Sequence, residues 1–185
     1  MQKIVLFIFI MMTLPICGAK ANPMFGAGDD NSFILHIGHG TGDGTLFKLI
    51  YPGFWEFEPM TVLMAQYSQP MTIFRLPARQ NIGLVQNFGY ESDRGLSFTA
   101  FGISWDASLF DWRGFYIGLG LGPYLRDSKD WRVESRLVFG EKFFIGARLS
   151  NKWRAEFFTL HFSNGNLTPV NDGFNFTGIS FNYSF

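Results

Sequence analysis

Residues 114–122, with the sequence GFYIGLGLG, decide the fold class of this chain. Large apolar side chains and small residues alternate along this stretch, and a period of two is typical of a β-strand with two different faces. The odd positions from Phe115 to Leu121 are apolar, whereas Gly118, Gly120 and Gly122 occupy even positions. Glycines on one face leave room for large neighbours inside a narrow barrel. No helical pattern follows them, which argues against a nucleotide-binding loop.

The same alternation recurs on both sides of this stretch. Between residues 131 and 139 the odd positions are mostly apolar, and the even positions include Arg132, Glu134 and Arg136. Opposite charges on one face can pair inside a barrel, so the apolar face should look at lipid. The pattern predicts strands at 95–106, 114–125, 132–150, 153–163 and 174–185. Runs at 32–39, 45–57, 60–76 and 80–91 predict three or four more strands, which we expect to end or bulge at Pro52, Pro59, Pro70 and Pro77.

The first 21 residues have the features of a secretory signal peptide. Lys3 precedes an apolar run from Ile4 to Cys17, and Ala19-Lys20-Ala21 fits the small-x-small pattern before a cleavage site. We therefore expect cleavage near Ala21, with residues 22–185 forming a single barrel domain. A chain cut there keeps no cysteine, which excludes a disulfide framework and a thiol nucleophile.

Composition then narrows the class of protein. Aromatic residues are 18% of the chain, with 23 Phe and 21 Gly. The expected mature chain holds no apolar run of the ~18 residues that a membrane helix needs. The fold that fits is all-β: an eight-stranded antiparallel transmembrane β-barrel of the outer-membrane type, in which every backbone group pairs with a neighbouring strand. Localisation in a bacterial outer membrane follows, and the terminal Phe185 is expected to be recognised by the barrel assembly machinery.

The charge balance and the positions of two histidines argue against a nucleic acid partner and against a metal site. The formal net charge is zero, so no nucleic acid partner is expected. His36 and His39 are three residues apart in a strand and should face opposite sides, so we expect no metal site there. We also expect no cofactor, and the sequence leaves open whether the barrel forms a homodimer.

A candidate catalytic pair lies near the C-terminus, in the sequence His161-Phe162-Ser163-Asn164-Gly165. Residues two apart in a strand point to the same face, so the His161 imidazole can take the Ser163 hydroxyl proton. The odd positions of 153–163 place this pair on the lipid-facing side. The substrate class that fits is an acylated membrane lipid. Asn164 and backbone N–H groups of the turn at Gly165 are candidate donors to the oxyanion.

These residues resemble the outer-membrane lipid A 3-O-deacylases. The likeness covers His-aromatic-Ser-Asn-Gly together with Leu167, Pro169 and Asn171-Asp172-Gly173, and extends loosely back to Gly120. The resemblance implies an eight-stranded barrel that hydrolyses the 3-position ester of lipid A, in lipopolysaccharide, as a serine carboxylic-ester hydrolase.

One departure from the family pattern concerns the residue that orients the histidine. The resemblance implies a glutamate two residues after Asn-Asp-Gly, where this chain has Asn175. By parity Asn175 lies on the face of His161, and its amide oxygen can accept the ring N–H and fix the tautomer. It cannot neutralise the imidazolium, and Asp172 is the nearest carboxylate in the sequence.

Two further function classes stay open. One is a non-catalytic small barrel with a structural or adhesive role in the outer membrane. The other is a barrel phospholipase or acyl transferase that uses the same His161 and Ser163. A porin is disfavoured, since eight strands leave no open channel.

Overall fold

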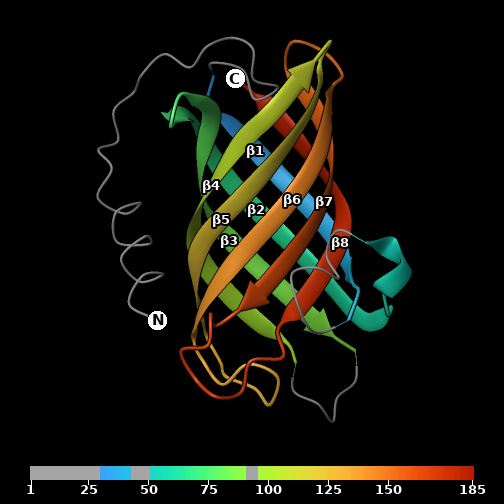
Figure 1. Cartoon of the computed structure of the whole chain (residues 1–185), viewed down its shortest axis with the longest axis vertical. Coiled ribbons are helices and arrows are strands. Elements are labelled where there is room, and N and C mark those ends of the chain that lie inside the picture. The colour runs from blue at the N-terminus through green and yellow to red at the C-terminus, as the bar shows by residue number, and fades with distance from the viewer. Residues whose placement is uncertain (1–29, 43–50, 91–95) are drawn as a thin grey trace.

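The computed structural model describes residues 30–42, 51–90 and 96–185. Its strands form a closed barrel in which each strand pairs antiparallel with the next and β8 returns to β1 (Figure 1). The strands are β1 (Ser32–Gly40), β2 (Glu58–Ile73), β3 (Leu76–Gly89), β4 (Phe98–Trp112), β5 (Phe115–Arg126), β6 (Leu137–Arg148), β7 (Trp153–Ser163) and β8 (Phe174–Ser184). The predicted eight-stranded antiparallel barrel is confirmed. The predicted signal peptide, 1–21, lies outside the described residues.

Side chains alternate between the two faces of the barrel wall as the sequence predicts. On β5, Leu119 is 47% exposed on the outer surface. At the next residue, Gly120, an added Cβ would lie only 2.2 Å from Oδ1 of Asp106 inside the barrel. On β7, Trp153 and Phe157 are exposed outside while the even-numbered residues from 154 to 162 are buried. The outer face is therefore apolar and the inner face carries the charges.

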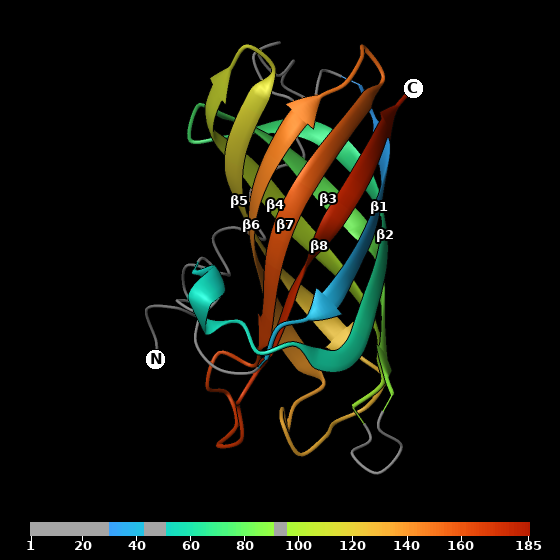
Figure 2. The ribbon, with the colours of Figure 1, turned by 90° about the vertical axis from the view of Figure 1, so that its right-hand side faces the viewer.

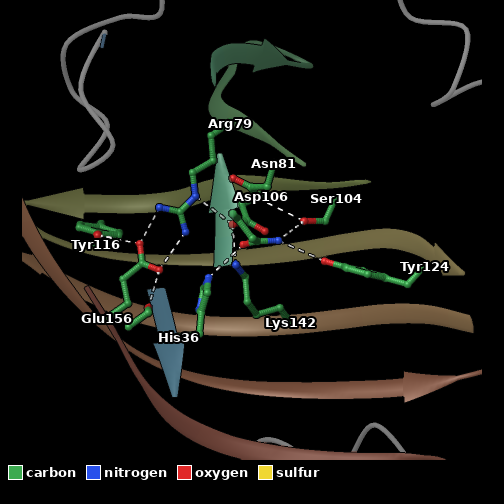
Figure 3. A network of polar contacts seen from close by, with 11 residues as sticks. His36, Arg79, Asn81, Ser104, Asp106, Tyr116, Tyr124, Lys142 and Glu156 are labelled. Atoms are coloured by element: carbon green, nitrogen blue, oxygen red, sulfur yellow. Dashed lines mark hydrogen bonds and ion pairs between the residues drawn. The ribbon is translucent and has the colours of Figure 1, made fainter. Parts of the chain in front are cut away.

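A network of paired charges fills the middle of the barrel (Figure 3). Arg79 of β3 donates from its two terminal nitrogens to Glu156 of β7 at 2.7 and 2.8 Å. Its Nε donates to Asp106 of β4 at 2.9 Å, and Lys142 of β6 donates to the same carboxylate at 2.6 Å. Tyr116 of β5 donates to Glu156 at 2.9 Å. The barrel interior is thus a packed polar core rather than an open channel.

The predicted strand 132–150 is wrong at its beginning. β6 starts at Leu137, and residues 127–136 form a loop that touches the neighbouring loop through the isolated bridge of Val133 with Asn171. Arg132 is buried there and donates two hydrogen bonds to Glu58, whereas Glu134 is exposed. The alternation of charge arose from a loop that folds over the barrel rim rather than from the two faces of a strand.

The predicted strand 45–57 and two of the predicted proline breaks also need correction. Residues 43–50 lie outside the described residues, and the described part contains a short 3-10 helix, η1 (Pro52–Phe54), and no strand. The pairing of β1 with β2 shifts register between His39 and Gly40, so that β2 bulges at Pro59 as predicted. Pro70 lies inside β2 and Pro77 is the second residue of β3, without a break at either. The β1 ladder ends where Ser32 pairs with Ser68, so β2 has a free edge beside Pro70, where a residue without N–H is tolerated.

The two ends of the barrel differ in the length of their connections. At the end that holds the C-terminus the strands are joined by the short turns 74–75, 113–114 and 149–152. At the opposite end lie the longer connections 41–57, 90–97, 127–136 and 164–173 (Figure 2). Outer-membrane barrels carry short turns on the periplasmic side and long loops outside, so the end with long loops corresponds to the external one. Within the described ranges there is no helix long and apolar enough to cross a membrane.

The face assignment on β5 can be tested by substitution. Leu119→Arg should destabilise the barrel by about 2–4 kcal/mol, because it puts a charge on the lipid-facing surface near mid-strand. Leu119→Phe keeps an apolar side chain there and serves as the matched control. The free energy of unfolding in lipid vesicles and heat-dependent gel mobility measure the effect. Equal stability of the two variants would contradict the outward placement of residue 119.

Candidate active site

His161 and Ser163 lie at the end of β7, at the barrel end with the long loops. Their neighbours Leu160 and Phe162 belong to the buried interior cluster, and the Phe162 ring lies 5.1 Å from the ring of Tyr124. The alternation along β7 therefore turns His161 and Ser163 outward. They are nevertheless only 6% and 8% exposed. The histidine and serine thus share an outward but sheltered position.

An aromatic segment from the β1–β2 connection lies against the same wall of the barrel. Trp55 stacks on Phe157 of β7 with ring centroids 6.3 Å apart, and Phe57 lies 6.0 Å from His39 of β1. Figure 2 shows η1 outside the barrel wall near this end. Tyr51, Phe54 and Phe57 are each more than half exposed. The outer surface near the site is therefore rich in apolar rings that a lipid chain can contact.

Asn175 of β8 holds the histidine ring. His161 and Asn175 are directly paired residues of β7 and β8, and Nδ1 of the ring donates to Oδ1 of the amide at 2.7 Å. With the proton on Nδ1, Nε2 carries the lone pair that a general base needs. Asn175 is itself fixed at the barrel seam: its backbone oxygen accepts from Thr41 at 2.8 Å, and its N–H donates to Gly42 at 3.0 Å.

Asn164 organises the loop that follows Ser163. Its side-chain amide donates to Oγ1 of Thr168 at 2.6 Å and to the backbone oxygen of Val170 at 2.9 Å. Its backbone N–H donates to Oδ1 of Asn171 at 2.7 Å. These donors bind within the loop, so a role of Asn164 toward the oxyanion stays a prediction. Gly165 and Asn166 both have positive φ angles, 61° each, which form the tight turn beside the serine.

The other predicted residues lie apart from the pair. Asp172 is exposed in the loop, with its backbone N–H donating to Arg132. His36 points inside, where it bonds Gln66 at 2.9 Å, and His39 points outside. Within the described residues no cluster of His, Cys, Asp or Glu could hold a metal ion.

One residue of this surface escaped the sequence analysis. The pairing of β6 with β7 puts Glu141 directly opposite His161. Its signal in the sequence is an acidic residue at an odd, lipid-facing position between Phe139 and Phe143.

The chain is similar to known proteins both in sequence and in fold. The family model of lipid A 3-O-deacylase (PagL) matches residues 56–184, which include β2 to β8 and the candidate site. A search of curated proteins finds no match.

Two solved structures are similar to the barrel. The outer membrane enzyme PagL superposes with a TM-score of 0.57 at 14% identity, over 83% of this chain and 99% of that one. Neisserial surface protein A (NspA) gives 0.52 at 11% identity, over 84% of this chain and 97% of that one. At these identities the two solved structures show the fold alone. The family model, in contrast, matches most of the chain. The chain therefore belongs to the lipid A 3-O-deacylase (PagL) family.

Proposed function

We propose that this protein is an outer-membrane esterase that removes the 3-position acyl chain of lipid A, with Ser163 as nucleophile and His161 as general base. The observation that carries the proposal is the bond from His161 Nδ1 to Asn175 Oδ1 at 2.7 Å, which leaves Nε2 as the base two residues from Ser163. Membership of the deacylase family supplies the substrate class.

The chemistry follows the usual course of a serine esterase. Ser163 Oγ attacks the ester carbonyl carbon while its proton passes to His161 Nε2. Backbone N–H groups of the turn at Gly165, and Asn164 after exchange of a loop bond, stabilise the oxyanion. The sugar oxygen leaves with the proton from His161, and water then hydrolyses the acyl-serine to release the fatty acid.

The position of the site suits a substrate held in the membrane. Both residues face outward at the end with long loops, where the external leaflet of the outer membrane meets the barrel. The acyl chain can then lie along the outer wall, beside the exposed rings of Phe54 and Phe57. Lipopolysaccharide reaches this site by lateral diffusion and need not leave the membrane.

Two partners of the barrel belong to the same proposal. Phe185 ends the chain beside β1, where its ring lies 5.2 Å from Phe33, and it serves the barrel assembly machinery as an outward aromatic signal. Association of two barrels is a separate expectation, which the mass of the purified protein in detergent would test.

The nucleophile and the base can be tested together. Ser163→Ala and His161→Ala should each remove nearly all lipid A hydrolysis, and the double variant should be little worse, because the two residues act as one unit. Release of fatty acid by the purified barrel and the mass of extracted lipid A measure the loss. Ser128→Ala, a half-buried serine of loop 127–136, is the matched control. Retention of most activity in either single variant would refute the assigned roles, and loss of chains from glycerophospholipid instead of lipid A would make the protein a phospholipase.

The orienting residue gives a second test. Asn175→Ala should lower the rate of the chemical step, because it removes the acceptor that fixes the ring. Asn175→Glu should raise it by adding a negative charge beside the imidazolium. Single-turnover kinetics with both variants separate this step from lipid binding. Unchanged rates in both, with Ser163→Ala inactive, would assign the orientation of His161 to another group.

Gly173 sets the position of the histidine ring from the loop side. A Cβ there would lie 2.6 Å from His161 Cε1 and 3.3 Å from Nε2, and the residue has a φ of +75°. The ring occupies space that only glycine leaves open. Any other residue must displace either the ring or the loop.

Gly173→Ala should therefore reduce hydrolysis at least tenfold through displacement of Nε2 from the serine, which we estimate from the sensitivity of catalysis to misplacements on the order of 1 Å. The matched control is Gly114→Ala, with a φ of +89° in a turn at the opposite end of the barrel. It carries similar backbone strain without a histidine neighbour. Fatty acid release by both variants in folded form measures the difference, and equal activity would argue against the importance of this contact.

A further inference from the structure

Glu141 is an acidic residue on the lipid-facing side of β6. The inner face of this strand is marked by Lys142, whose ammonium binds Asp106, and by the fully buried Phe144. Glu141 precedes Lys142, so the alternation turns it outward, between Phe139 and Phe143 on the same face. Ionisable side chains are unfavourable on a lipid-facing surface and usually mark a function there.

The residues paired with Glu141 on the two neighbouring strands show which group its carboxylate can contact. Glu141 is paired with Leu121 of β5 on one side and with His161 of β7 on the other. Leu121 is apolar. Within the described part of the chain, no hydrogen bond or salt bridge of the Glu141 carboxylate is found. Directly opposite residues have Cβ atoms about 4.5–5.5 Å apart, so the glutamate side chain can reach the imidazole.

His161 is therefore flanked on two sides by residues with different chemistry. On the β8 side the Asn175 amide binds Nδ1 and sets the tautomer, but it has no charge. On the β6 side stands a carboxylate in the same row across the sheet. In a serine esterase the imidazole becomes a cation when it takes the hydroxyl proton, and a nearby negative charge stabilises that state. Asp172 is a poorer candidate because it is exposed in the loop.

We propose that Glu141 is a positioning residue whose carboxylate stabilises protonated His161, so that orientation and charge compensation come from two strands, Asn175 on β8 and Glu141 on β6. This inference rests on the proposed esterase function. During attack the proton moves from Ser163 Oγ to His161 Nε2, and the Nδ1 proton stays on the ring toward Asn175. Glu141 exchanges no proton in this step.

The test is a set of charge substitutions in the full-length folded barrel, assayed on lipid A in detergent micelles. Glu141→Gln keeps the size and polarity of the side chain and removes its charge. It should lower kcat about tenfold and leave KM unchanged, since a charge near the ring acts in the transition state alone. Glu134→Gln, in the exposed part of loop 127–136, is the matched control and should leave both constants unchanged.

A second variant separates charge compensation from a structural role. Asn175→Glu combined with Glu141→Gln moves the carboxylate from one flank of His161 to the other. Asn175→Glu should raise kcat by a larger factor in the Glu141→Gln background than in the wild type, whereas a merely structural Glu141 would give the same factor in both backgrounds. The rate of Ser163 labelling by a fluorophosphonate probe should follow kcat in all variants and does not depend on lipid binding.

The outcomes distinguish this inference from the proposed function. An active wild type whose Ser163→Ala variant is inactive, with an unchanged kcat in Glu141→Gln, overturns the role of Glu141 and keeps the esterase. A gain from Asn175→Glu that is equal in the wild type and in the Glu141→Gln background also overturns it. A folded wild type that neither hydrolyses lipid A nor labels at Ser163 overturns the proposed function and this inference with it.

Discussion

The requirement that every backbone N–H and C=O find a partner within the membrane governs this structure. A sheet meets it only when its last strand returns to its first, and here β8 pairs with β1 along the whole of β1. Closure forces each strand to show one face to lipid and the other to a narrow interior. The period of two in the sequence reflects this separation of each strand into a lipid-facing and an inward-facing side. The place of any residue along a strand then determines whether it meets acyl chains or the core.

The interior solves a different problem, which is how to bury charges. Arg79 reaches both Glu156 and Asp106, so its guanidinium links β3 to β7 and to β4. Lys142 adds a second cation to Asp106. Because removal of one member leaves an uncompensated buried charge, at a cost of about 3–5 kcal/mol for such pairs, the network favours one arrangement of the strands. A rigid wall also fixes the outward-facing positions of His161 and Ser163, the proposed catalytic pair, at the end of β7.

Much of this fold could be predicted from local patterns, and the failures have identifiable causes. β7 has the predicted bounds, Trp153–Ser163, because alternation and a turn at each end define it locally. The predicted start of β6 was wrong because Arg132 and Val133 are both buried within a loop, where Glu58 binds the Arg132 side chain and Asp130 binds the backbone N–H of Val133. The break predicted at Pro70 was wrong because a proline is tolerated where β2 has no neighbour, beyond the end of its pairing with β1. That end cannot be located from the sequence.

The candidate site likewise contains one contact that could be predicted from the sequence and one that could not. The partnership of His161 with Asn175 follows from parity and from the short distance between them along the chain. The neighbourhood of His161 and Glu141 depends on the register between β6 and β7, which the turn at 149–152 fixes. A shift of one residue would turn Glu141 inside. Such a relation cannot be found from either strand alone.

The hydrogen bonds of Asn175 with Thr41 and Gly42 join the residue that holds His161 to the segment that follows β1, the first strand of the barrel. These bonds form only when the first and last strands meet. Before they meet, Asn175 lacks these two backbone bonds, although the pairing of β7 with β8 already places its amide beside His161. In the proposed esterase, a chain whose barrel has not closed would therefore carry His161, Ser163 and Asn175 without the bonds that fix Asn175 to the end of β1. Closure of the barrel would then complete the support of the proposed site in the same step that completes the fold.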